Sequence, residues 1–160
     1  MNEDESLGRY GLRPADSDLD QIREMLEAQA VRESQHQGDG DTDLMKLCCV
    51  QLFNAGCLND VLVIWRAKES SWDAHCSIDV QLLCGAGLEA TKEYLAAEGS
   101  RSASAALDYL LQCEATGDFA DFSVDNQSRW YSKYYLPDPA SSSRRTPDIA
   151  TSATGGSRRA

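Results

Sequence analysis

Three glycines divide the middle of the chain into segments of nearly equal length. Gly56, Gly87 and Gly117 are separated by 31 and 30 residues. On both sides of these glycines, apolar residues recur at steps of three and four, which is the period of a helix with a buried face. Glycine often ends a helix because it adopts the left-handed conformation without strain. The pattern therefore predicts helix–glycine–helix units, about three of them, between residues 44 and 122.

The segment before Gly56 is the most apolar of these units. Residues 44–55 place apolar side chains on nearly every side of the predicted helix. A helix of this kind packs against neighbours on several sides, so we expect it to lie at the centre of the fold. The other predicted segments are 60–68, an apolar run over 78–84, 88–98 and 102–116.

The turn at Gly56 resembles a known family of helical repeats. Residues 55–65, Ala-Gly-Cys-Leu-Asn-Asp-Val-Leu-Val-Ile-Trp, resemble the middle of an ankyrin repeat, where a glycine turn joins two short helices. Residues 87–90 are similar, and residues 117–122 are also similar to the turn of tetratricopeptide repeats. The ankyrin opening Thr-Pro-Leu-His is missing from each unit. The resemblance implies a stack of helix pairs that binds other proteins along a concave surface and has no catalytic residues.

The segments on either side of this core have different characters. Residues 1–15 are charged and are predicted to be a flexible N-terminus. Residues 17–36 predict an amphipathic helix, and residues 125–135 predict an aromatic helix that caps the open end of the stack with Trp130 and Tyr134. From Pro137 onward Ser, Thr, Gly, Pro and Arg dominate, which is typical of a disordered tail. We therefore expect one all-α, solenoid-like domain over residues 16–136.

The charge of the chain limits its possible partners. With 26 acidic and 15 basic residues, the net charge is −11. Nucleic-acid binding relies on Lys and Arg to neutralise phosphates, so this balance argues against it. An acidic surface suits a basic partner protein, although the charge is equally compatible with a role in solubility alone.

No segment of the sequence predicts a membrane span or an export signal. The longest apolar stretches, such as residues 47–53 and 61–65, are much shorter than the roughly 20 residues that a span requires. The chain begins Met-Asn-Glu-Asp-Glu, which is acidic where a secretory signal is basic and then apolar. We therefore expect a cytoplasmic protein.

Cysteine, histidine and aspartate offer few candidate metal or catalytic sites. The six cysteines include no Cys-x-x-Cys pair, and we expect them to be buried free thiols. His75, Cys76 and Cys84 are the alternative, a site for an enzyme or a metal protein. The acidic segment 39–43 has the alternating aspartates that open a calcium loop, but it lacks the later glycine and glutamate. The sequence therefore predicts no catalytic residue, no metal and no cofactor.

A cluster of tryptophan and basic residues around the connector 69–72 is the best candidate for a partner-binding patch. Tryptophan and arginine are the residue types most often found as energetic anchors of interfaces. The patch consists of Trp65, Arg66, Lys68 and Trp72. The leading hypothesis is a non-catalytic protein-interaction protein with an acidic surface, such as an inhibitor or immunity-type protein for a basic partner. A structural assembly subunit is a further alternative.

Overall fold

The computed structural model describes residues 1–139, and the regular secondary structure of this part of the chain is entirely helical, without strands. It contains eight α-helices and three short 3-10 helices, so the predicted all-α class is confirmed. The predicted disordered tail falls almost wholly on residues 140–160, which lie outside the described residues. The elements are α1 (Glu3–Tyr10), η1 (Asp16–Asp18), α2 (Leu19–Gln35), α3 (Thr42–Ala55), η2 (Leu58–Asp60), α4 (Val61–Lys68), α5 (Trp72–Ser77), η3 (Val80–Cys84), α6 (Leu88–Glu98), α7 (Arg101–Ala115) and α8 (Val124–Tyr135).

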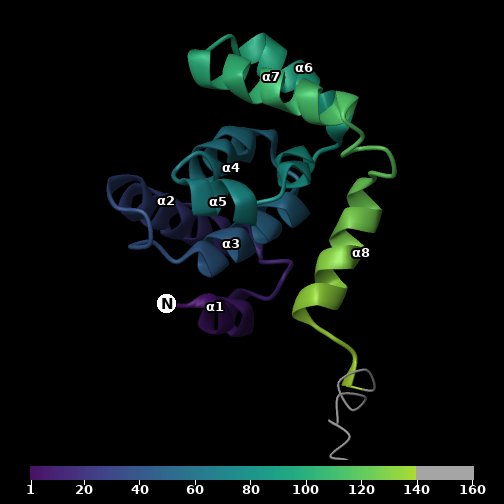
Figure 1. Ribbon diagram of the computed structural model, residues 1–160. Helices are drawn as coiled ribbons and strands as arrows, with labels where there is room; N and C mark the ends of the chain where they lie inside the picture. The colour runs from purple at the N-terminus through teal and green to yellow at the C-terminus, as the bar shows by residue number, and fades with distance from the viewer. Residues whose placement is uncertain (140–160) are drawn as a thin grey trace, which may run out of the picture.

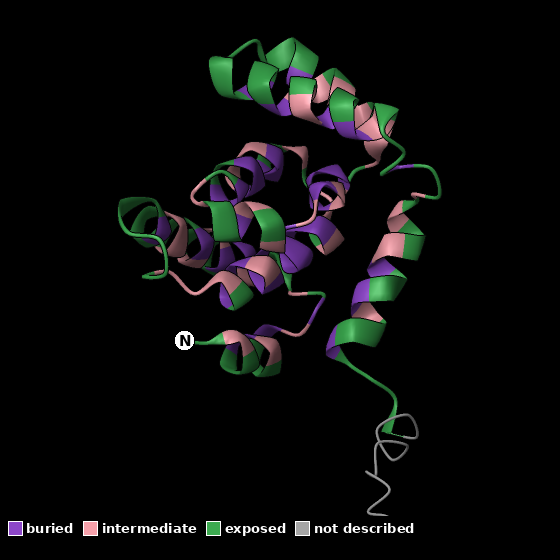
Figure 2. Ribbon diagram, in the orientation of Figure 1, coloured by how far each residue is buried: buried purple, intermediate pink, exposed green. Residues whose placement is uncertain are grey.

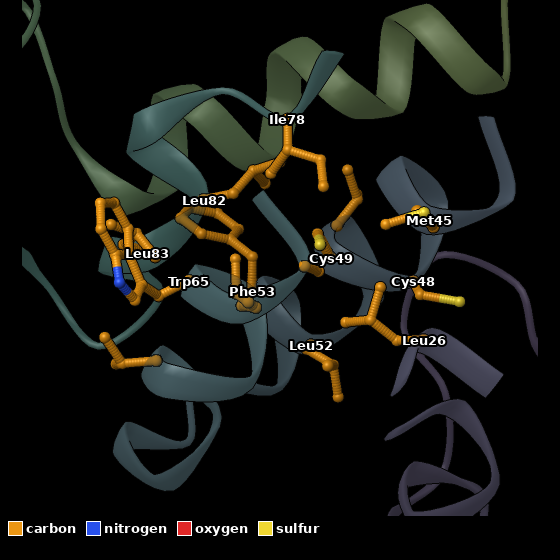
Figure 3. Packing of buried hydrophobic residues seen from close by; sticks show 14 of the residues in the cluster. Leu26, Met45, Cys48, Cys49, Leu52, Phe53, Trp65, Ile78, Leu82 and Leu83 are labelled. Carbon is orange, nitrogen blue, oxygen red and sulfur yellow. The ribbon is translucent and has the colours of Figure 1, made fainter. Parts of the chain in front are cut away.

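Helix α3 lies at the centre of the fold, as its sequence predicts. Helices α1, α2, α5 and α8 and the turn η3 all contact it. The α6–α7 hairpin lies at one end of the molecule and α8 runs along one side (Figure 1). Figure 3 shows how α3 contributes Met45, Cys49 and Phe53 to the packed core. Since α3 is apolar on nearly every side, each face of it can bury against a different neighbour.

The three evenly spaced glycines occupy different kinds of turn. Gly56 ends α3 in the left-handed conformation, with φ 70° and ψ 25°. Gly87 precedes α6 with φ 102° and ψ 154°, and Gly117 follows Thr116, the C-cap of α7. The structure therefore does not confirm a solenoid of equivalent hairpins.

The second unit also differs from the first in its helices. The apolar run 78–84 forms the 3-10 turn η3, and the six-residue helix α5 precedes it. This turn brings Gly85 against the end of α3, where a Cβ atom would lie 2.4 Å from the carbonyl oxygen of Phe53. Of the three predicted glycine turns, the one at Gly56 thus joins two α-helices, α3 and α4, in the ankyrin-like order. Helices α6 and α7 are joined through another glycine, Gly99, which ends α6 in the left-handed conformation.

The N-terminus is folded, so the prediction of a flexible segment over residues 1–15 was wrong. Asn2 and Glu5 form a reciprocal capping box that starts α1. Beyond α1, the side-chain amides of Gln51 and Asn54 on α3 donate hydrogen bonds to the carbonyl oxygens of Gly11 and Leu12, both at 2.8 Å. These bonds hold the segment after α1 on α3.

Helix α8 faces the core with a different pair of aromatic residues from the one predicted. Tyr131 and Tyr135 are buried, whereas Trp130 and Tyr134 are 52% and 57% exposed. Figure 2 shows this division along α8, which is buried on its inner side and exposed on its outer side. The hydroxyl of Tyr131 donates a hydrogen bond to Asp79, which fixes this orientation. The predicted capping role of Trp130 and Tyr134 is therefore wrong.

A buried carboxylate holds the loop between α2 and α3 in place. Glu33 is only 1% exposed and accepts hydrogen bonds from the backbone N–H groups of Gly38 and Gly40, both at 3.0 Å, and from the hydroxyl of Ser71. Burial alone would raise the pKa of this carboxyl, but the bonds from Ser71, Gly40 and Gly38 hold its pKa below the ordinary value. Glu33 thus links α2, the loop and the N-cap of α5.

Replacing Glu33 by glutamine is expected to lower the free energy of unfolding by about 1–3 kcal/mol at pH 7, because the bonds from its donors are no longer charge-assisted. The pKa of Glu33 is lower in the folded state than in the unfolded chain, so its contribution is complete above the unfolded value of 4.5. It is lost as the pH falls through the folded value. Urea titrations of both proteins between pH 7 and pH 3 measure the difference.

The control for this substitution is Glu24→Gln on the exposed side of the same helix. We expect this change to alter the free energy of unfolding by less than about 0.5 kcal/mol at either pH. A Glu33→Gln deficit of the same size at pH 7 and pH 3 would show that the ionised carboxylate does not stabilise the loop.

Candidate interaction surface

The predicted partner patch divides into two buried and two exposed residues. Trp65 is 7% and Lys68 is 3% exposed, because both lie on the face of α4 that carries the core residues Val61 and Ile64. Trp72, at the start of α5, is 70% exposed, and Arg66 is also exposed. Of these four residues, Arg66 and Trp72 are therefore the two whose side chains a partner could contact. Their role in binding stays a prediction.

Lys68 has a structural role that the sequence does not reveal. Its ammonium group donates hydrogen bonds to the carbonyl oxygens of His75, at 2.6 Å, and Ile78, at 2.5 Å. It also lies 5.6 Å from the ring centroid of Tyr109, a cation–π distance. Burial lowers the pKa of Lys68 from its ordinary value. The lysine therefore satisfies carbonyl groups at the end of α5 that would otherwise lack partners.

An aromatic cluster connects this buried lysine to the surface. The rings of Trp72 and His75 stack at 5.7 Å with an interplanar angle of 13°, and Tyr109 of α7 packs edge-on against His75 and at a tilt against Trp65. His75 is held at both ring nitrogens: Nδ1 lies 3.0 Å from Glu69 Oε1, and Nε2 lies 3.2 Å from the hydroxyl of Tyr109. The exposed indole of Trp72 thus packs on one aromatic neighbour, His75, and leaves most of its surface open.

A groove passes between α2, α4 and the start of α7, and its edge reaches this cluster. Four of its ten lining residues are apolar, three are charged and three are serines. A second hollow, lined by Glu69, Ser71, Trp72 and His75, shares Glu69 with the groove. We call the two together the α2–α4 groove; its longer part is lined by Glu27, Ala30, Val31, Ser34, Val63, Trp65, Arg66, Glu69, Ser70 and Ser102.

Among the residues that line the α2–α4 groove, carboxylates outnumber basic groups. Glu27 and Glu69 are acidic, whereas Arg66 is basic. Arg66 forms an exposed ion pair with Glu27 at 3.3 Å. The same imbalance extends over the described part of the chain, because only one of the 26 acidic residues but four of the 15 basic residues lie beyond Pro139.

The alternative site at His75, Cys76 and Cys84 is not assembled in the structure. Cys84 is buried and Cys76 is exposed, and all six thiols are free. Burial raises the pKa of the Cys84 thiol to about 12, which disfavours the thiolate that a nucleophile or metal ligand requires. Among residues 1–139, no group of three or more His, Cys, Asp or Glu side chains could hold a metal ion. In the acidic segment, Asp41 instead caps α3 by accepting a hydrogen bond from the N–H of Leu44.

A second exposed aromatic pair lies on the outer side of α8. Trp130 and Tyr134 stack at 5.7 Å with an interplanar angle of 10°, and the ammonium group of Lys46 lies 5.3 Å from the ring centroid of Tyr134. Arg129 and Lys133, both exposed, lie on the same helix. Asp79 lines a shallow hollow together with Trp130, so both charges are present near this pair.

Comparisons of the chain with protein-family models, curated proteins and solved structures found no match. Within the described residues, each helix is too short or too polar to cross a membrane. The function must therefore be inferred from the chain's own residues.

Proposed function

We propose that the protein is a non-catalytic binding protein that holds another protein through an acidic surface. The observation that carries the proposal is the 70% exposed indole of Trp72, which is stacked on His75 beside the α2–α4 groove. A tryptophan side chain has only two rotatable bonds and so loses little entropy on binding, which is one reason why tryptophan recurs among interface anchors.

The charge of the chain supports a basic partner. Oppositely charged surfaces attract each other over about a Debye length, which accelerates the encounter and disfavours acidic competitors. For the same reason the proposal excludes nucleic acid as the ligand, because a surface rich in carboxylates repels phosphates. Six free thiols are consistent with a reducing compartment, so we propose that binding takes place in the cytoplasm.

An inhibitor or immunity-type protein is the more specific form of this proposal. Such a protein only has to bind and cover a basic enzyme or toxin, and a rigid helical surface of one charge is sufficient for that. This specific form rests on physical character alone, since a fold does not determine a function.

Capture of partners on the immobilised full-length chain is expected to recover a protein with a strongly basic isoelectric point. Because attraction between exposed charges is screened at high ionic strength, recovery at 0.1 M salt should exceed recovery at about 1 M salt at least several-fold. Mass spectrometry of the eluted proteins identifies the partner, and titration of the purified partner at both salt concentrations measures the binding constants.

A charge-altered chain serves as the control for this capture. Replacing the exposed residues Glu27, Glu69 and Asp73 by glutamine removes carboxylates around Trp72 and should reduce recovery, whereas replacing the equally exposed Glu89, Glu93 and Glu98 of α6 should not. A partner that is neutral or acidic, or one recovered equally at both salt concentrations, would contradict the proposal.

A further inference from the structure

We infer that the α2–α4 groove binds a segment of the partner that carries an arginine next to an apolar side chain, with the guanidinium stacked on Trp72. This inference rests on the proposed function and specifies the surface and the chemistry of the bound segment. The arginine lies beside the carboxylate of Glu69, and the apolar side chain enters the part of the groove formed by Val31 and Val63.

The environment of Trp72 favours arginine over the other side chains of a basic partner. A guanidinium is planar, so it can stack on an indole face and at the same time form two parallel hydrogen bonds with a carboxylate. Trp72 is stacked on His75 and the rest of its ring is exposed, and Glu69 lies in hydrogen-bond contact with that same histidine. The indole of Trp72 and the carboxylate of Glu69 thus both contact His75. An arginine could stack on the indole and bind the carboxylate at once, whereas the compact ammonium group of a lysine could make only one of these contacts well.

The rest of the groove accounts for the apolar part of the segment. Val31 is 54% exposed, so its side chain is open to a partner in the groove. Together with Ala30, Val63 and the edge of Trp65, it lines an apolar floor between α2 and α4. A partner side chain that covers this floor removes apolar surface from water, which favours binding. An apolar contact with charged residues near it matches the usual arrangement of an interface, an apolar core within a polar rim.

Arg66 opposes the binding of a cationic segment in this arrangement. Its guanidinium lies in the groove and is paired with Glu27 at 3.3 Å. An incoming arginine must share Glu27 with it and is repelled by it. Removing Arg66 should therefore tighten binding, which is the opposite of what its place in the predicted partner patch suggests.

The probe for the test is a set of fluorescent peptides, each with one arginine and one leucine separated by one to five glycine or serine residues. Each peptide has a counterpart in which citrulline, which has the shape of arginine without its charge, replaces the arginine. Titration of the full-length chain is expected to show one preferred spacing, at which the arginine peptide binds at least tenfold more tightly than its citrulline counterpart. A peptide with lysine in place of arginine should bind about threefold or more weakly.

Substitutions in the chain then locate the binding surface. Trp72→Ala and Val31→Asp should each weaken the preferred peptide by about 5- to 30-fold, and Arg66→Ala should tighten it about two- to fivefold. The matched control is Trp130→Ala, because Trp130 is also an exposed tryptophan, at 52%, that stacks on an aromatic ring. It should change the affinity less than twofold.

Different failures overturn different claims. If no peptide distinguishes arginine from citrulline, or if Trp130→Ala weakens binding as much as Trp72→Ala, the inference about the groove is wrong. If the Trp72→Ala chain still captures the basic partner with undiminished affinity, Trp72 and the groove are excluded as the contact. Only the proposal of binding through another part of the acidic surface then stands. A full-length chain with Arg144, Arg145, Arg158 and Arg159 replaced by glutamine tests the chain's own tail as the occupant. Tenfold tighter peptide binding by that variant would assign the groove to the tail and overturn the assignment to a partner.

Discussion

Replacing Arg23 by alanine is expected to lower the free energy of unfolding by about 3–5 kcal/mol, since this change leaves a buried carboxylate without its cation. Asp60 is 2% exposed, and both of its oxygens accept hydrogen bonds from the Arg23 guanidinium, at 2.6 Å and 3.0 Å. The pair joins α2 to the start of α4. These bonds to Asp60 raise the pKa of Arg23 above its ordinary value, so the guanidinium keeps its charge. Urea unfolding measures the loss.

The control for Arg23→Ala is Arg66→Ala, because both arginines form ion pairs between α2 and α4. The Arg66–Glu27 pair is exposed on both sides, at 60% and 54%, so its removal should cost less than about 1 kcal/mol. The double variant Arg23→Ala, Asp60→Ala should lose less stability than the two single variants predict together, since it leaves no buried charge. Equal losses for Arg23→Ala and Arg66→Ala would show that burial of Asp60 does not determine the effect.

The elements that the sequence predicts well are those determined by local pattern. The all-round apolar character of residues 44–55 depends only on neighbouring positions, and α3 spans Thr42–Ala55 with Gly56 in the left-handed conformation. The stripe over residues 102–116 likewise becomes α7, with Ala103, Ala106 and Leu110 buried. In these cases the helical period and the stop signal agree, so little else is needed.

The orientation of side chains on short helices could not be predicted in the same way. A helix of eight residues such as α4 offers two turns, and which face becomes buried depends on neighbours that are distant in sequence. Trp65 and Lys68 face Tyr109 of α7, about forty residues further along the chain. The sequence contains Tyr109, but no local pattern pairs it with Trp65 or Lys68. The sequence alone therefore predicts an exposed position for both residues.

The even spacing of the glycines predicts equivalent hairpins, which the structure does not confirm, and the reason is again packing between distant segments. Gly56, Gly87 and Gly117 have positive φ, which their sequence context predicts, but a positive φ is compatible with several turns. Equivalent turns would require equivalent packing, and the segment 80–84 instead forms a 3-10 turn whose end at Gly85 lies against Phe53. A period in sequence is therefore evidence of a repeat only when the contacts repeat as well.

The same reasoning applies to α8, whose buried side is set by one tyrosine. Replacing Tyr131 by alanine is expected to lower the free energy of unfolding by about 3–5 kcal/mol, because its ring is fully buried and packs edge-on against Phe53 at 6.5 Å. Replacing it by phenylalanine keeps the ring and removes only the 2.5 Å hydrogen bond to Asp79, at a cost of about 1–1.5 kcal/mol. Asp79 keeps its ion-pair contact with Lys46 in both variants.

Tyr134, three residues further along α8, supplies the control, because it is aromatic and 57% exposed. Tyr134→Ala should cost less than about 1 kcal/mol. Hydrogen exchange adds a readout that separates a local from a global effect. Helix α8 contacts the rest of the fold chiefly through α3, so in Tyr131→Ala the amides of residues 124–135 should lose protection before those of α3 do. If Tyr134→Ala proves as costly as Tyr131→Ala, or if α8 and α3 lose protection together in Tyr131→Ala, then Tyr131 does not hold α8 in the way described.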